Sequence, residues 1–226
     1  MYGIKNKPKT IFFPLYCDDD VFQNNAKPLN PDDIHLVYAG GVAGSHRNPK
    51  QYGNIQFHDI INILSKQKIH FHIYPSPSNI RADYEEYESI AKQNSFFHFH
   101  EPVAQENLAK ELSKYHFGIH TGFVNAEFHM QSSDKYKLCT TLKLFNFIEA
   151  GLPVIISDNI IYQSWVLERN KSGITINRGE LDNLSNVILG RNYMELVQNV
   201  SEAQKKLSLK KNTIRLLNFY NKIVKK

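Results

Sequence analysis

The chain of 226 residues has few cysteines, no long apolar run and no leader-like start, and each absence excludes a class of protein. Its two cysteines, Cys17 and Cys139, are too few for a framework of disulfides or for a cysteine-based metal site. No uninterrupted apolar run approaches the roughly 18 residues of a membrane-spanning helix. Residues 1–13 lack the apolar core and the small-residue cleavage site of a signal peptide. We therefore expect a cytoplasmic protein with reduced thiols.

The basic charge is concentrated in the last part of the chain. The net charge is +5, yet the segment between Lys205 and Lys226 carries seven lysines, one arginine and no acidic residue. Proteins that hold nucleic acid by charge usually spread basic residues over the folded body, so no nucleic acid is expected as a partner. In this segment Leu216, Phe219 and Ile223 recur at helical spacing. The predicted helix either packs on the domain with its lysines in solvent or makes peripheral contact with an anionic membrane.

Several catalytic motifs are also missing from the sequence. There is no nucleophile elbow of the G-x-S-x-G type and no phosphate-binding G-x-x-x-x-G-K-[ST] loop. Histidines do occur in pairs, His70 with His72 and His98 with His100, each pair on one face of an expected strand. Four imidazoles could hold zinc, but helices cover both faces of the expected sheet. We interpret them as hydrogen-bonded histidines and expect no metal and no cofactor.

Apolar runs alternate along the chain with segments of helical periodicity. This alternation predicts parallel strands joined by right-handed crossovers, hence an α/β, doubly wound, Rossmann-like sheet followed by C-terminal helices. We expect three parts: a linker remnant over residues 1–30, a nucleotide-binding domain over 31–190 and a helical tail over 191–226. A long loop is expected over residues 121–139. The expected strands are 34–40, 69–76, 96–102, 117–122, the run after Pro153, and 173–176.

The helix that begins near Thr140 or Thr141 carries two charges that oppose its own dipole. In a doubly wound sheet this helix start faces the ligand crevice at the carboxyl ends of the strands, where free N–H groups favour an anion. Lys143 lies in the first turn and Glu149 in the last, and both are unfavourable positions for their charge. Either the two residues serve a ligand, or Lys143 reaches solvent and Glu149 pairs with a neighbour.

A glycine-rich stretch follows the first expected strand. Gly40 and Gly41 permit a tight turn that brings backbone close to a phosphate, and Arg47 could grip that phosphate bidentately. The stretch is not the dinucleotide pattern G-x-G-x-x-G, and no helix follows it at once. A surface loop is an equally good interpretation.

The sequence LKLFNFIEAGLPVIISD, which contains Lys143, Glu149, Gly151 and Pro153, resembles the signature of GT-B glycosyltransferases of the glycosyltransferase group 1 type. The resemblance extends from about Lys9 to the end of the chain, with the segments in the family's order. It implies the C-terminal, donor-binding half of a GT-B enzyme. Only the end of the acceptor-binding half could fit into residues 1–30.

By this resemblance Glu149 matches the family glutamate that binds the ribose hydroxyls of a nucleotide-sugar. Thr140, Thr141 and Lys143 match the helix start that meets the diphosphate. The position of a second family glutamate, which contacts the donor sugar, is occupied here by Thr141.

Three further residues are placed by the same resemblance. Gly40, Gly41 and Arg47 fall where the family's first loop approaches the sugar and the phosphates. Glu101 falls near the site that receives the base.

We therefore expect a glycosyltransferase donor-binding domain that binds a nucleoside-diphosphate sugar, with UDP-sugar as the expected donor and an unknown glycan or lipid-linked acceptor. The acceptor domain would come from a separate chain or an upstream segment. The alternatives are a non-catalytic nucleotide-binding module or truncated remnant, a nucleic-acid binder that acts through the basic tail, and a sugar-nucleotide epimerase of the same architecture.

Overall fold

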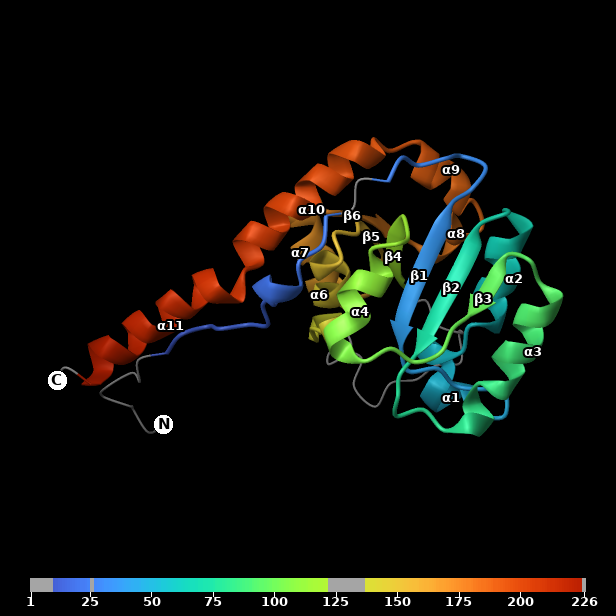
Figure 1. Ribbon diagram of the computed structural model, residues 1–226, viewed down its shortest axis with the longest axis horizontal. Coiled ribbons are helices and arrows are strands. Elements are labelled where there is room, and N and C mark those ends of the chain that lie inside the picture. Colours follow the sequence, from blue (N-terminus) through green and yellow to red (C-terminus); the bar gives the residue numbers. More distant parts are fainter. Residues whose placement is uncertain (1–9, 25–26, 122–136, 225–226) are drawn as a thin grey trace, which may run out of the picture.

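A computed structural model describes residues 10–24, 27–121 and 137–224 of the chain, and these form one α/β body with a projecting helical arm (Figure 1). The centre of the body is a six-stranded sheet in the order β3-β2-β1-β4-β5-β6, and every strand pair in it is parallel. The strands are β1 His35–Gly40, β2 His70–Pro75, β3 Phe97–Phe99, β4 Phe117–His120, β5 Val154–Ser157 and β6 Gly173–Ile176. The predicted doubly wound sheet is thus confirmed.

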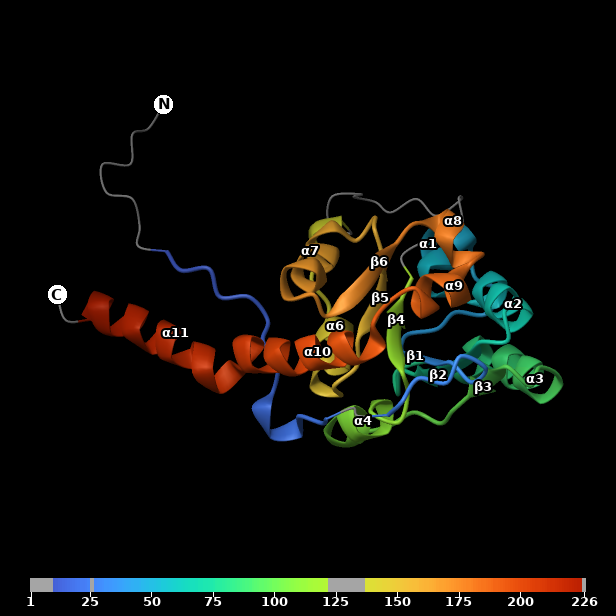
Figure 2. The same cartoon turned by 90° about the horizontal axis from the view of Figure 1, so that it is seen from above.

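The helices lie on both faces of the sheet (Figures 1 and 2). Their bounds are α1 Pro49–Tyr52, α2 His58–Lys66, α3 Glu85–Gln93, α4 Gln105–Leu112, α6 Leu142–Glu149, α7 Ile161–Asn170, α8 Arg178–Leu181, α9 Leu184–Leu189, α10 Tyr193–Leu207 and α11 Leu209–Val224. Short 3-10 helices span η1 Asp19–Val21, η2 Gly53–Ile55 and η3 Arg81–Asp83. Most of the predicted loop over 121–139 lies outside the described residues.

Two clusters of buried apolar side chains lie on the two faces of the sheet. Successive residues of a strand point to opposite faces, and β1 shows this directly. Leu36 and Tyr38 belong to the cluster formed with α2, α3, α8 and α9, whereas Val37 and Ala39 belong to the cluster formed with α4, α6, α7 and α10. The strands are therefore held from both sides, as expected for a parallel sheet.

The C-terminal helices behave differently from each other. Helix α10 packs on the body and buries Val200 and Ala203 completely. Helix α11 runs away from the body (Figures 1 and 2), and its Arg215 donates to the Tyr16 hydroxyl of the N-terminal segment at 2.7 Å. Where α10 meets α11, the backbone of Cys17 pairs with that of Ser208. The expected divisions at residues 30 and 190 stay predictions.

Much of the apolar surface of α11 is exposed. Ile214, Leu217 and Tyr220 are each more than half exposed, and Asn212 is the one buried residue of the helix. The tail therefore combines a packed first helix with an unpacked second one. None of the described helices is both long and apolar enough to cross a bilayer.

Candidate functional site

A cavity of about 320 Å³ lies at the carboxyl ends of β1 and β2, beside the start of α6. Figure 1 shows the arrowheads of β1 and β2 pointing to this edge of the sheet. β1 lies between β2 and β4 and is the point where the strand order changes direction, which is the usual ligand site of such sheets. Its lining residues are Ala39, Gly40, Gly41, Tyr74, Pro75, Ser76, Pro77, Val103, Gln105, Leu108, Thr141, Leu142, Lys143 and Asn146.

The side chain of Lys143 lines this cavity and lies close to Gly40. A Cβ atom on Gly40 would lie 2.3 Å from Lys143 Cε and 3.0 Å from the Tyr38 hydroxyl, and Gly40 has a φ of +149°. Only glycine combines this backbone conformation with room for the lysine. Lys143 Nζ lies 5.4 Å from the centre of the Tyr38 ring. Gly40 was predicted to let the backbone approach a ligand closely. In the structure it makes room for the side chain of Lys143.

The ammonium group of Lys143 has no anionic partner in the described part of the chain. No carboxylate of that part lies within ion-pair distance, and burial lowers the pKa of Lys143 from its ordinary value. A half-buried cation in the first turn of a helix is doubly unfavourable, because desolvation and the helix dipole both oppose it. An anion in the cavity would remove both costs.

The start of α6 has no side-chain cap. Thr141 occupies the N-cap position, but its hydroxyl donates to Gln163 Oε1 at 3.2 Å rather than accepting from a helix N–H. Gln163 in turn donates to the carbonyl of Cys139 at 3.2 Å, which fixes the chain just before the helix. The first N–H groups of α6 thus remain available to a ligand.

Two buried polar atoms near this helix start also lack a hydrogen-bond partner among the described residues: Thr140 Oγ1 and His120 Nδ1. His120 ends β4, and burial followed by the nearby Lys143 charge lowers its pKa to about 3, so its ring is neutral. Buried polar atoms without partners are uncommon and mark places where a ligand or water is bound.

An amide pair forms another wall of the cavity. Gln105 Nε2 in the first turn of α4 donates to Asn146 Oδ1 on α6 at 3.1 Å. Asn146 lies one turn beyond Lys143, so the two side chains share one face of α6. The amide groups of Asn146 and Gln105 offer further donors and acceptors to a ligand with hydroxyl groups. The sequence analysis missed both residues, although the spacing of three from Lys143 could have identified Asn146.

Four of the eight predicted site residues line the cavity: Gly40, Gly41, Thr141 and Lys143. Thr140 lies next to them and contributes the unpaired hydroxyl. These five come from two segments that are 100 residues apart in sequence, and the sheet brings them together. The predicted grouping of the glycine turn with the helix start is therefore observed.

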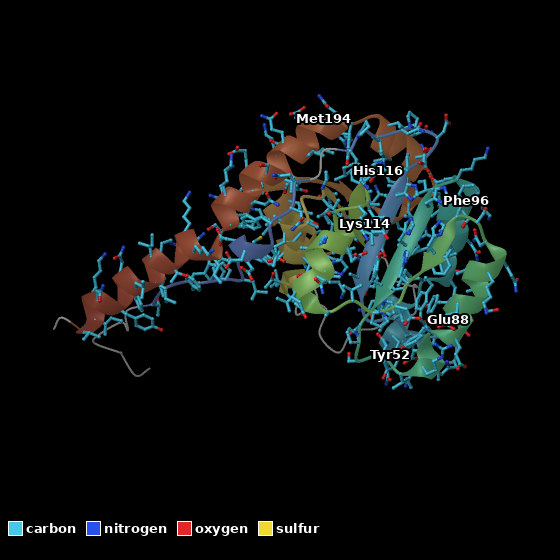
Figure 3. The ribbon with its side chains drawn as sticks, in the orientation of Figure 1. Tyr52, Glu88, Phe96, Lys114, His116 and Met194 are labelled. Carbon is cyan, nitrogen blue, oxygen red and sulfur yellow. The ribbon has the colours of Figure 1, made fainter. Side chains whose placement is uncertain are left out.

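Arg47 does not line the cavity. Its guanidinium donates to both carboxylate oxygens of Asp83, at 2.8 and 3.0 Å, and lies 5.4 Å from the ring of Tyr52. Figure 3 shows Tyr52 near α1, at the carboxyl edge of the sheet. The pair holds the pKa of the Asp83 carboxyl below its ordinary value, and Arg47 fastens the loop after β1 to η3. The expected grip on a phosphate is replaced by this internal ion pair.

Glu149 also lies away from the cavity, at the opposite end of α6 from Lys143. Its Oε1 accepts the backbone N–H of Asp18 at 2.7 Å, and its carbonyl accepts that of Gln23 at 2.7 Å. The residue is buried, and burial is the main cause that raises the pKa of its carboxyl. The expectation that Lys143 and Glu149 hold one ligand between them does not hold in this structure. Glu149 instead anchors the N-terminal segment to α6.

Glu101, the residue expected near the base, is exposed and is absent from the cavity lining. The segment that follows β3 does reach the cavity, but through Val103 and Gln105. The role expected for Glu101 at the base stays a prediction.

The fold is a doubly wound, Rossmann-like sheet with a cavity at its carboxyl edge, a class of domain that GT-B glycosyltransferases contain. The model of the family "Glucosyltransferase 3-like, C-terminal domain" matches residues 52–218, about three quarters of the chain. The chain belongs to this family. A search of the curated proteins gave no match.

Solved structures show the same fold at low sequence identity. Sucrose-phosphate synthase from Thermosynechococcus elongatus matches with a TM-score of 0.59 and 13% identity, covering 93% of this chain and 52% of that one. The GtfA/B complex matches with a TM-score of 0.57 and 13% identity, covering 93% and 38%. Anabaena HepE in complex with UDP-glucose matches with a TM-score of 0.53 and 12% identity, covering 84% and 49%. The chain thus spans 38% to 52% of the length of these proteins.

Proposed function

We propose that this chain binds a nucleoside-diphosphate sugar, with UDP-sugar as the donor, and serves as the donor-binding domain of a glycosyltransferase. One observation carries the proposal: the uncapped start of α6 and the unpaired Lys143 lie together in the cavity at the carboxyl edge of the sheet. Helix starts of this kind favour phosphate. The family match and the structure of HepE with UDP-glucose support the choice of ligand.

In the proposed complex the diphosphate lies at the start of α6. The N–H groups of the first helical turn and the ammonium of Lys143 then stabilise the charge that develops on the departing diphosphate. Thr140 Oγ1 and His120 Nδ1, which have no hydrogen-bond partner among the described residues, are proposed as secondary partners. No step of this mechanism needs a metal ion, because the cationic lysine and the helix dipole supply the positive charge.

Asn146 and Gln105 are proposed to bind the ribose hydroxyls, which is the role that the family resemblance implied for Glu149. Asn146 lies on the cavity wall three residues beyond Lys143 on α6, about 4.5 Å along the axis, and Gln105 on α4 donates to it. That separation suits a diphosphate joined to a ribose. Tyr74, Val103 and Leu108 provide apolar surface for the flat base or the sugar.

Transfer to a glycan or a lipid-linked acceptor is proposed to require an acceptor-binding domain from another chain or from another segment of the same protein. Helix α11 is the candidate for peripheral membrane contact, since its exposed Ile214, Leu217 and Tyr220 adjoin a lysine-rich face. Flotation with vesicles that contain anionic lipid tests this contact. Binding that is lost on replacing Leu217 and Tyr220 by serine supports it, and absence of binding contradicts it.

Calorimetric titration with UDP and with GDP tests the donor proposal. We expect one UDP per chain, with tighter binding of UDP than of GDP. Lys143→Met keeps the length of the side chain and removes its charge, and we expect it to weaken UDP binding about 10- to 100-fold, the range for hydrogen bonds to charged groups. Lys110→Met on the exposed side of α4 is the matched control and leaves the affinity unchanged. No binding to the wild-type chain, or equal binding to Lys143→Met, would contradict the proposal.

A further inference from the structure

A cluster of imidazoles lies on the face of the sheet that carries α4 and runs across β1, β2 and β3, with one member just before β4. It contains six of the ten histidines of the chain: His35, His70, His72, His98, His100 and His116. Figure 3 shows His116, a member of the cluster, and Phe96 at the amino ends of β4 and β3. The donor cavity does not use these six residues.

The strand register produces the cluster. His35 of β1 is paired with His70 of β2, and His72 of β2 is paired with His98 next to it in the sheet. The rings of the first pair stack at 4.5 Å between centres and 14° between planes, and those of the second pair at 4.3 Å and 12°. Parallel strands in register therefore place the rings face to face along the sheet.

Hydrogen bonds between ring nitrogens join the histidines. His35 Nδ1 lies 2.8 Å from His72 Nε2, and His72 Nδ1 lies 3.0 Å from His100 Nε2. A parallel bond joins His70 Nδ1 to His98 Nε2 at 2.9 Å. The predicted hydrogen-bonded histidines are thus observed. Covering helices were the reason to expect no metal here, but the side chains of His35 and His70 remain 26% and 22% exposed.

Asp33, just before β1, faces Nε2 of both partly exposed rings. Its Oδ1 lies 2.8 Å from His35 Nε2 and 3.7 Å from His70 Nε2, and the three atoms all lie within 4.8 Å of one another. Zinc bonds of about 2.0 to 2.2 Å place tetrahedral ligand atoms roughly 3.4 Å apart. The observed separations lie around that value. The carboxylate is 56% exposed, which leaves the site open to solvent.

We propose that Asp33, His35 and His70 bind a divalent transition-metal ion such as Zn²⁺, with a fourth position open to water. The arrangement is typical of a set of metal ligands. Nε2 of each ring lies near the Asp33 carboxylate, while Nδ1 of each ring is hydrogen-bonded to another histidine. Such bonds orient the rings of metal-binding histidines. The ion joins the segment before β1 to β2, so it stabilises the amino edge of the sheet and leaves the donor cavity to the nucleotide.

Metal binding also determines which ring nitrogen of each histidine carries the proton. A neutral imidazole carries its proton on one nitrogen. When Nε2 of His35 donates to Asp33, its Nδ1 must accept from His72, and His72 Nδ1 must accept from His100. When a metal occupies His35 Nε2, the proton moves to Nδ1 and both hydrogen bonds reverse direction. The metal thus changes the tautomers of His35, His72 and His100 together.

Titration of Zn²⁺ into the full chain, without a histidine tag and after removal of metal by a chelator, tests the site. We expect one ion per chain. Asp33→Asn keeps the shape of the side chain, His70→Gln keeps a polar group, and each weakens binding at least tenfold. His58→Gln is the matched control, because His58 also faces a carboxylate, that of Glu86 at 3.2 Å, and leaves zinc affinity within twofold of the wild type.

Two results would overturn this site: no zinc binding to the wild-type chain, or zinc binding that neither Asp33→Asn nor His70→Gln weakens. Nitrogen NMR of the imidazoles gives an independent reading in the folded protein. We expect zinc to move the proton of His35 from Nε2 to Nδ1 and to change the tautomer of His72 with it. Unchanged ring-nitrogen signals at saturating zinc would also overturn the site. These measurements contain no nucleotide, so their outcome is independent of the donor proposal.

Discussion

The two ends of α6 differ in how their charges are satisfied. At the start, Lys143 and the first N–H groups have no anionic or capping partner in the described residues, and they line a cavity. At the end, Glu149 is buried and accepts the backbone N–H of Asp18 at 2.7 Å. Both charges oppose the helix dipole. We propose a ligand as the partner of the first charge, whereas the second has a contact within the protein.

This difference shows that an unfavourable charge on a helix indicates an interaction partner, but not whether that partner is a ligand or another part of the protein. The sheet determines which end of α6 faces a ligand, because the helices start at the carboxyl edge of the sheet, where ligands bind. The predictions that follow alter one end of α6 at a time and compare nucleotide affinity with folding stability.

The largest effect is expected from Gly40→Ala, at the end of β1 against Lys143 of α6. The new Cβ would lie 2.3 Å from Lys143 Cε, on a backbone with a φ of +149° that other residues rarely adopt. We expect the variant to lose about 1–3 kcal/mol of unfolding free energy from strain and to bind UDP at least tenfold more weakly, as Lys143 is displaced. Urea denaturation and calorimetry measure the two effects.

Gly41→Ala provides the stability control for that variant. Its Cβ would meet nothing nearer than Ile55 Cδ1 at 3.8 Å. We expect its unfolding free energy to stay within about 0.5 kcal/mol of the wild-type value. Equal losses in the two variants would contradict the close approach of Lys143 to Gly40.

At the other end, Glu149→Ala is expected to affect folding and not binding. It removes the acceptor of the part-buried hydrogen bond from the Asp18 N–H, which costs about 0.5–1.5 kcal/mol. We expect lower stability in urea denaturation and a UDP affinity within twofold of the wild-type value. Normal stability with a tenfold loss of affinity would instead restore the ribose role that the family resemblance implied.

A smaller loss of binding is expected from Asn146→Ala. Removing one amide that bonds to a ribose hydroxyl costs about 0.5–1.5 kcal/mol, or roughly two- to tenfold in affinity. The loss should be smaller for 2′-deoxy-UDP than for UDP if the amide binds the 2′ hydroxyl. Calorimetry with both nucleotides measures this, and an unchanged affinity for both would remove Asn146 from the site.

The smallest effect concerns pH and Glu149→Gln. Burial raises the pKa of Glu149 above its ordinary value of 4.5, so between these two values the folded chain binds more protons than the unfolded chain. The wild-type protein therefore loses stability as pH rises from about 4.5 through the raised pKa. The glutamine keeps the bond to Asp18 and has no charge, and the decline over that window should be smaller in Glu149→Gln. Urea denaturation across the window measures the difference, which would be absent if Glu149 were solvated.

The sequence predicted most of the fold because the strands are short apolar runs between glycines and helical segments. It also predicted the helix start at Thr141 and the glycine turn at Gly40, since both follow from the carboxyl-edge rule. Glu149 could have been excluded from the cavity by helix geometry alone. Six residues separate it from Lys143, which places the two about 120° apart around the axis and about 9 Å apart along it.

Other parts of the site depended on contacts that sequence patterns do not show. Arg47 is paired with Asp83, which is 36 residues away, and nothing near either residue indicates the pair. The histidine cluster depends on the register of three strands. Pairs such as His70 with His72 show which face each strand presents, but not which residues of neighbouring strands are aligned.

The central claim is that a diphosphate binds at the start of α6. Titration of UDP into Lys143→Met and Glu149→Gln, side by side with the wild-type chain, tests it most directly. We predict that Lys143→Met weakens UDP binding about 10- to 100-fold and that Glu149→Gln binds like the wild type. Loss of binding in Glu149→Gln together with normal binding in Lys143→Met would contradict the claim.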